Sequence, residues 1–362
     1  MARRRKKGGI LFGITSRTLM LIAAALLGLS YLSVIVNPAK VWWMTVFGLL
    51  FVPAALLNLF LFVWAIYRKS RAVLIPAVAL LPAALFAGLY FQYHPSGERE
   101  EPAGDATDVK IVSYNVGRFR CGASDMTPQA SADSIVDFLN STDADIICLQ
   151  EFHLDNVTDI KKWFAKRFKG YYLDYYVYTL RSGRVGNIIL SRFPFKGKGK
   201  IEFDNSTNLA LYGDCSIGGR NLRIYNCHFQ SYSLSVPHLA KSIREDYREA
   251  VKYTENKMKS SVPIRAGQVD IVMKHIEECP TEAVVTGDFN DNPLSYTYYR
   301  LSRGRRDSFR EAGNGFGATY YAFRPFLRID YVLCPESVQP VGHEVVHNRF
   351  SDHYPVVATL RI

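Results

Sequence analysis

Three long apolar runs in the first 94 residues constrain this chain more than any other feature of its sequence. They cover about residues 10–36, 41–67 and 72–93 and show no polar face at helical period. Each is near or beyond the ~18–20 apolar residues that cross ~30 Å of hydrocarbon as an α-helix. We therefore predict three N-terminal transmembrane helices. The alternative, a set of buried helices in a soluble protein, is disfavoured because no run has a polar side.

Basic residues gather around these runs and predict their orientation. Residues 1–94 contain ten Lys and Arg and no acid, so the net charge of +11 divides into +10 here and +1 for residues 95–362. Clusters at Arg3–Lys7 and Arg68–Arg71 contrast with the acidic segment after Tyr93. By the positive-inside rule, the N-terminus is cytoplasmic and everything after the third run is extracytoplasmic. The sequence thus predicts a multi-pass protein of a plasma or inner cell membrane.

Anchoring in a lipid bilayer is the simplest role for the three predicted helices. A cleaved signal peptide would explain the first basic cluster and the first run, but not the two later runs. No ionisable residue lies deep in the second or third run, which disfavours a transport path. The bilayer is therefore the predicted partner of this region, and the sequence indicates no protein partner.

The rest of the chain is predicted to form a linker and one domain. Residues 95–108 combine Pro, Gly and five acids with almost no large apolar side chain, which is typical of an exposed linker. Residues 109–362 alternate short β-rich runs with helical patterns and are about the longest chain that one core holds. Strands mixed with helices, with both hairpins and crossovers, indicate an α/β fold of packed layers.

Polar residues interrupt the β-rich runs near their C-terminal ends. In chain order they are Asn115, Glu151, Asp288 with Asn290, Asp330, and Asp352 with His353. Burying one such residue without a partner costs ~1–3 kcal/mol, and more when it is charged. Asp288 and Asn290 are two apart, so both side chains leave an extended strand on the same face. Four acids, two amides and a histidine in these places indicate a shared site for metal binding and proton transfer.

The donor atoms indicate the kind of metal. All six cysteines follow residue 109, but none forms a Cys-x-x-Cys pair, so structural zinc is disfavoured. Oxygen ligands without thiolates favour Mg²⁺ or Mn²⁺. We therefore predict a Mg²⁺ or Mn²⁺ site of the kind that assists phosphoester hydrolysis.

The segments that carry these residues resemble the endonuclease/exonuclease/phosphatase superfamily, from about Lys110 to the C-terminus. Gly287–Asn290 (Gly-Asp-Phe-Asn) and Ser351–His353 (Ser-Asp-His) are the most specific motifs. Leu149–Glu151 (Leu-Gln-Glu) and Arg328–Tyr331 (Arg-Ile-Asp-Tyr) come next. The resemblance implies a four-layer α/β/β/α sandwich with the site at one edge of its two sheets.

The resemblance also implies how the metal and the attacking water are held. Glu151 would be the main metal ligand, with Asn115 nearby and Asp352 completing or supporting the metal shell. Asp288 would orient or deprotonate the water. Asn290 would hold the phosphoryl oxygens.

Two histidines have more than one role open to them. His353, paired with Asp330, would be a general base or a cationic phosphate contact. His228 matches a second histidine of the deoxyribonuclease and sphingomyelinase branches, where it would contact phosphate or act as a general acid; a structural histidine is the alternative. Arg265 and Gln268 lie one helical turn apart and either face the site or lie on a solvated helix face.

Three functions follow from this sequence. The first is a membrane-anchored, extracytoplasmic, metal-dependent phosphoesterase acting on a lipid head group, a small ester or a nucleic acid. The second is a nuclease acting on external DNA or RNA, which the net charge of only +1 after residue 94 weakens. The third is a catalytically silent binding module on a membrane anchor, which the intact set of polar residues disfavours.

Overall fold

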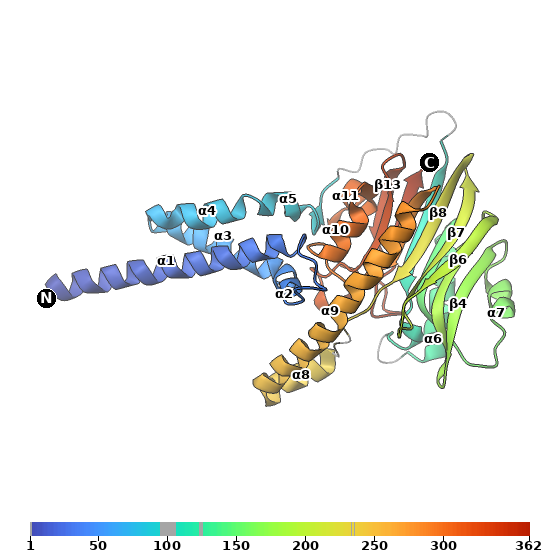
Figure 1. Cartoon of the computed structure of the whole chain (residues 1–362), viewed down its shortest axis with the longest axis horizontal. Helices are drawn as coiled ribbons and strands as arrows, with labels where there is room; N and C mark the ends of the chain where they lie inside the picture. The colour runs from blue at the N-terminus through green and yellow to red at the C-terminus, as the bar shows by residue number, and fades with distance from the viewer. Residues whose placement is uncertain (1, 95–105, 123–125, 233, 235) are drawn as a thin grey trace.

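The chain forms a helical region and a mixed α/β sandwich, which contact each other (Figure 1). The computed structural model describes residues 2–94, 106–122, 126–232, 234 and 236–362. The helical region comprises α1 (Ala2–Leu32), α2 (Met44–Leu49), α3 (Phe51–Tyr67), η1 (Arg71–Val73), α4 (Leu74–Leu80) and α5 (Ala83–Ala87). Most of the predicted linker, residues 95–105, lies outside the described residues.

Two six-stranded sheets form the sandwich. The first has the order β10-β12-β9-β8-β7-β6, with β6 (Phe195–Glu202), β7 (Leu209–Ile217), β8 (Arg220–His228), β9 (Glu282–Asp288), β10 (Arg305–Asp307) and β12 (Asp330–Pro335). The second has the order β13-β14-β2-β3-β5-β4, with β2 (Asp108–Asn115), β3 (Ile146–Leu154), β4 (Tyr172–Leu180), β5 (Gly183–Ser191), β13 (Gln339–Val345) and β14 (Val356–Arg361). Both sheets are mixed, because β2 pairs with β3, and β8 with β9, in parallel.

The two-residue alternation of each strand separates the sandwich into layers. Ile111 of β2 packs between the sheets with Val284 of β9, whereas its neighbour Val112 packs outward with Ile135 of α6 (Pro128–Ser141), as a pleated strand requires. α7 (Ile160–Arg167) covers the same outer face. α9 (Tyr247–Glu277) and α10 (Tyr296–Ser302) cover the outer face of the other sheet. The predicted sandwich of two sheets is confirmed.

The prediction of three continuous spans is wrong for the second and third runs. Within the described residues, Gly13–Leu32 is the one stretch of helix long and apolar enough to cross a membrane, and Phe51–Tyr67 and Arg71–Ala87 are shorter apolar helices. The third run breaks at Pro82, which lacks the N–H that a continuous helix needs. It then ends in a short strand, β1 (Phe91–Gln92), which pairs with β11 (Gly315–Phe316) of the sandwich.

The end of the helical region nearest the sandwich is part of the sandwich's own core. Leu27, Phe51 and Tyr90 belong to one buried cluster with Phe289 and Tyr331. Hydrogen bonds cross the same junction, from Ser33 Oγ to the Leu294 carbonyl (3.1 Å), from Asn292 Nδ2 to the Gly48 carbonyl (2.8 Å) and from Arg328 Nη2 to the Leu89 carbonyl (3.2 Å). The helices therefore pack directly on the segments that follow β9 and precede β12.

Candidate active site

Strand ends from both sheets meet at one edge of the sandwich. Asn115 ends β2, His228 ends β8 and Asp288 ends β9, while Asp330 begins β12. His228 and Asp330 are the register partners of Asp288 on its two sides. The structure gathers at this edge the residues predicted from the sequence, namely Asn115, Glu151, His228, Asp288, Asn290, Asp330, Asp352 and His353.

Asp288 is one of two almost completely buried acids of the site, with Asp330. Its carboxylate accepts hydrogen bonds from Asn115 Nδ2 (2.9 Å), the Asn290 backbone N–H (2.8 Å) and Asn290 Nδ2 (3.1 Å). Burial nevertheless raises the pKa of Asp288, although the nearby His353 opposes the shift. The result is a fixed carboxylate that accepts a proton more readily than an exposed one.

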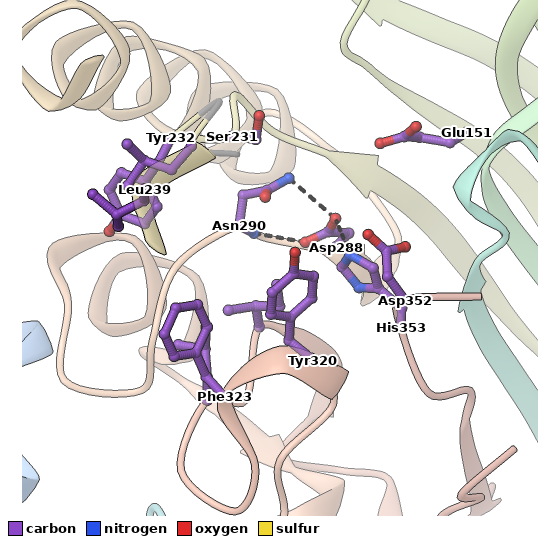
Figure 2. Close-up of a pocket in the computed structure, with 13 residues that line it drawn as sticks. Glu151, Ser231, Tyr232, Leu239, Asp288, Asn290, Tyr320, Phe323, Asp352 and His353 are labelled. Carbon is purple, nitrogen blue, oxygen red and sulfur yellow. Dashed lines mark hydrogen bonds and ion pairs between the residues drawn. The ribbon is translucent and has the colours of Figure 1, made fainter. Parts of the chain in front are cut away.

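The backbone before Asp288 explains the glycine of the Gly-Asp-Phe-Asn motif. Gly287 has φ +129°, and a Cβ there would lie 1.9 Å from the Cys227 carbonyl oxygen of β8. Asn290 also has a positive φ, 53°, a conformation that asparagine tolerates better than most residues. This bend lets Asn290 turn back onto Asp288. Both its amide and its backbone N–H then orient that carboxylate (Figure 2).

His353 lies between two acids. Its Nδ1 is 3.0 Å from Asp330 Oδ2 and its Nε2 is 3.8 Å from Asp288 Oδ2. Burial disfavours the imidazolium, but the charges of Asp330 and Asp288 outweigh it and raise the pKa of His353 well above its usual value. Asp330 thus holds the ring in one orientation and favours its cationic form.

Glu151 and Asp352 present carboxylates to the same cavity. Glu151 sits at an irregularity of β3 and has φ 51°, an uncommon conformation that often marks a functional position. Burial opposes its ionisation, but His228, Arg118 and His353 together lower the pKa of Glu151. The side chain is therefore ready to bind a cation.

The donor set fits a hard divalent cation. Within the described residues, ligand atoms of Asp288, Asp330 and His353 lie within 4.8 Å of one another, close enough to hold a metal ion. Two of these groups, however, are engaged with each other through His353 Nδ1. Glu151 and Asp352 are the more exposed carboxylates, and oxygen donors of this kind suit Mg²⁺ or Mn²⁺.

Asn115 and Asn290 make contacts other than those expected from their predicted roles beside the metal and the phosphoryl oxygens. Asn115 donates its amide to Asp288 and accepts the Gly117 N–H at Oδ1 (3.0 Å), so it acts as a support for Asp288 here. The amide of Asn290 donates to the Phe229 carbonyl (2.9 Å) as well as to Asp288. Its donors are thus occupied by the protein in this arrangement.

His228 faces the acids without a short contact to either. Its Nε2 lies 3.7 Å from Glu151 Oε1 and 3.9 Å from Asp288 Oδ2. Burial lowers the pKa of His228, although Glu151 opposes the shift. A neutral imidazole beside two carboxylates is placed to donate a hydrogen bond or to accept a proton.

Several residues at the site carry no recognisable sequence signal. Arg118 bonds Glu151 through Nε (3.2 Å), and the ring of Tyr320 lies 5.2 Å from that of His353. Neither residue belongs to a motif. Arg265 and Gln268 are buried, so the solvated-face alternative is wrong for both.

Arg265 and Gln268 support one wall of the cavity from behind. Arg265 Nε lies 3.2 Å from Asp291 Oδ2, and its guanidinium stacks on the ring of Tyr232 at 4.2 Å. Gln268 Oε1 accepts the Gln230 N–H (2.7 Å). These contacts fix the segment that carries Tyr232.

Solved structures share this fold at low sequence identity. An endonuclease/exonuclease/phosphatase from Beutenbergia cavernae is 20% identical with a TM-score of 0.55, covering 70% of this chain and 72% of that one. The human nocturnin catalytic domain is 15% identical with a TM-score of 0.52, covering 70% and 94%. D. rerio TDP2, complexed with a single strand DNA product, is 16% identical with a TM-score of 0.51, covering 70% and 99%.

Family models cover both regions of the chain. Residues 11–88 match a domain of unknown function. No curated protein matches the chain. Residues 112–353, which include all eight predicted site residues, match the model of the endonuclease/exonuclease/phosphatase family. The sandwich, its edge site and this match together establish that the chain belongs to the endonuclease/exonuclease/phosphatase family.

Proposed function

We propose that this chain is a phosphoesterase that uses Mg²⁺ or Mn²⁺ to hydrolyse a phosphodiester or a phosphomonoester. The observation that carries the proposal is that Asp288 and His353, the latter paired with the buried Asp330, line the same cavity as Glu151 and Asp352. It combines a carboxylate of raised pKa with an imidazole held as a cation. Family membership supports the same reaction class, since the family's members are hydrolases acting on phosphate esters.

The side chains divide the proton transfers between them. Asp288 would take a proton from the attacking water, whose oxygen bonds to phosphorus as the P–O ester bond breaks. The His353 imidazolium would stabilise the charge that develops on the phosphoryl group. The leaving oxygen would take its proton from water, and the neutral His228 would donate a hydrogen bond from its ring N–H to the phosphoryl group. Asn115 and Asn290 keep Asp288 in place during these steps.

Glu151 and Asp352 would hold the metal, and when bound it would neutralise charge on the phosphate oxygens. These two are the more exposed carboxylates of the site, although Glu151 is also paired with Arg118. Asp330 is already engaged with His353. Asp352 Oδ1 accepts one weak hydrogen bond from Ser351 Oγ (3.3 Å).

We also propose that the helical region holds the chain in a membrane, with α1 crossing it and the sandwich outside the cytoplasm. The basic N-terminus of α1 and the basic turn between α3 and α4 lie at the end of the region far from the sandwich (Figure 1). The positive-inside rule assigns both to the cytoplasmic face. The opposite end, which contacts the sandwich, is then extracytoplasmic.

Two other functions make different predictions. A nuclease would cleave DNA or RNA better than small esters, and the solved TDP2 complex contains a single strand DNA product. A silent binding module would retain its ligand but hydrolyse nothing. The buried, mutually oriented acids favour the enzyme over the module, because such groups are costly to bury without a use.

The test uses isosteric substitutions in the full chain, assayed in amphipol with Mg²⁺ or Mn²⁺. Glu151→Gln, Asp288→Asn and His353→Gln are each expected to lower hydrolysis of p-nitrophenyl phosphate or bis-p-nitrophenyl phosphate by ~10²–10⁴-fold. Chelation should abolish turnover, and either metal should restore it. Asp137→Asn, on the exposed side of α6, is the matched control and should retain full activity.

Retained turnover in all three variants would overturn the site assignment. Metal-independent turnover in the wild type would overturn the metal assignment alone.

A further inference from the structure

The cavity at the site has one polar wall and one apolar wall (Figure 2). Its volume is about 220 Å³. The candidate catalytic and metal-binding groups form the polar side. The apolar side consists of Leu234, Leu239, Phe323, Leu327 and Ile329. Hydrolysis of a phosphate ester needs only the polar wall, so the apolar wall indicates a second role in binding the substrate.

The residues that line the cavity indicate what kind of group the phosphate of the substrate is attached to. Of the described residues that line the cavity, none is a Lys or Arg. Nucleic acid recognition depends on such cations along the backbone, so a polyanionic strand fits poorly here. An apolar wall instead gains free energy by removing hydrocarbon from water.

One residue of the apolar wall lies on a helix that projects from the sandwich. Leu239 belongs to α8 (Val236–Glu245), which projects from the sandwich on the side where the helical region attaches (Figure 1). Beyond the cavity, Ile243 of α8 and Tyr247 at the start of α9 are 52% and 68% exposed. Lys241 and Arg244 are exposed beside them. Apolar and basic side chains on one helix are typical of contact with a lipid surface.

The helical region also contacts the polar wall. Asn292, two residues after Asn290, bonds the Gly48 carbonyl, and Ser33 bonds the Leu294 carbonyl. The segment that carries Asn290 is therefore attached to the proposed anchor. The cavity thus lies between α8 and a segment attached to the proposed anchor.

We propose that the apolar wall binds the hydrocarbon part of an amphipathic phosphate ester, whose phosphoryl group lies at Asp288 and His353. The inference rests on the proposed function and narrows its substrate class to lipid-like esters with an alkyl, acyl or prenyl chain. The polar wall binds the phosphate group of the ester, and Leu239 and Phe323 contact its hydrocarbon chain. The bilayer that holds the anchor supplies such molecules at the cavity.

The experiment compares soluble esters that differ only in chain length. The full chain is placed in amphipol, free of phospholipid, and kcat/KM is measured for methyl and octyl p-nitrophenyl phosphate, or for methyl and octyl phosphate if the enzyme cleaves only monoesters. Each buried methylene is worth a factor of about four. The octyl ester is therefore expected to give a kcat/KM roughly tenfold or more above that of the methyl ester.

Substitutions in the apolar wall test whether this wall causes the preference for the octyl ester. Leu239→Asn and Phe323→Asn should each reduce the ratio of kcat/KM for the octyl ester to that for the methyl ester severalfold. Val157→Asn, at a side chain 91% exposed on another loop, should leave the ratio unchanged. Because the decisive comparison is made in the wild type, the test does not depend on a variant folding.

The outcomes separate the inference from the proposed function. Hydrolysis of both esters with equal kcat/KM would overturn the inference and leave the phosphoesterase intact. Faster cleavage of a single-stranded oligonucleotide than of the octyl ester would also overturn it. Failure of the metal-loaded wild type to cleave any phosphate ester would overturn the proposed function itself.

Discussion

The sandwich and the helical region bury their apolar side chains in different ways. Between the two sheets, Val284 and Val332 are completely buried. On the helices, Phe60 of α3 and Leu85 of α5 are 65% and 79% exposed. Apolar surface of that extent is unusual on a soluble protein, whereas hydrocarbon surroundings would cover it at no cost. This exposed apolar surface supports the membrane location proposed for the helical region.

This difference in burial is absent at the junction of the two regions, where apolar side chains of the helices are buried in the core of the sandwich. Leu27, Phe51, Leu89 and Tyr90 share one buried cluster with Phe289. A simple tether would leave the sandwich complete without it. The near end of the helical region thus belongs to the fold of the sandwich, whereas the far end carries the exposed apolar side chains.

Removing residues 1–94 tests this view with the largest expected effect. Burial of each large apolar side chain contributes ~1.5–3 kcal/mol. Loss of Leu27, Phe51, Leu89 and Tyr90 would therefore cost on the order of 6–12 kcal/mol, comparable with the whole stability of a typical domain. We expect residues 95–362 alone to aggregate or to melt far below the full chain in a thermal scan.

A chain that begins at Gly88 is the matched comparison, since it keeps Leu89 and Tyr90 and should recover part of the lost stability. If residues 95–362 melted cooperatively at the temperature of the full chain, the helices would be a tether after all.

Breaking the buried ion pair at the junction is expected to cause the next largest loss of stability. Arg328 Nη1 lies 2.8 Å from Asp307 Oδ2, both side chains are 2% exposed, and Arg328 also donates to the Leu89 carbonyl. Arg328→Ala would leave Asp307 charged and buried without its partner, at a cost of ~3–5 kcal/mol. Urea unfolding of the full chain measures this loss. Arg310→Ala, at an exposed position of α11 (Ser308–Ala312), should cost less than ~0.5 kcal/mol.

How far the sequence predicts this molecule depends on the range of the interactions. Asn115 and Asp288 were identifiable because each interrupts an apolar strand, and strand ends meet at a sheet edge. The break at Pro82 had a local signal as well, but its effect depends on neighbouring helices. Arg118 and Tyr320 had none. Their places at the site follow from loop paths that no short pattern specifies.

The junction itself had no sequence signal either. Gly48 is one glycine among many in apolar helices, and only the structure shows that a Cβ there would lie 2.4 Å from the Leu294 carbonyl oxygen. Close approach of two segments so distant along the chain is a tertiary property. The sequence therefore predicted the sandwich and its site better than the way in which the helices join them.

A methyl group at Gly48 tests that close approach. Gly48→Ala should push α2 away from Leu294 and cost ~1–3 kcal/mol, partly offset by up to ~1 kcal/mol of added helix propensity. Gly28→Ala is the control, because nothing lies within 4 Å of a Cβ there. Melting temperatures of the two variants in amphipol should move in opposite directions. Equal shifts would mean that α2 does not press on the sandwich.

The smallest expected effect lies in the far half of the helical region. Asn58 of α3 is completely buried and donates from Nδ2 to the Ala23 carbonyl of α1 (2.8 Å) and to the Ala54 carbonyl (2.9 Å). Hydrogen bonds between membrane helices contribute about 0.6 kcal/mol on average, up to ~1.7. Asn58→Leu should therefore lower the melting temperature of the helical region slightly and leave the kcat/KM of the sandwich unchanged. A loss of turnover in this variant would show that the far half of the helices also supports the site, and the distinction drawn between the two ends of the helical region would fail.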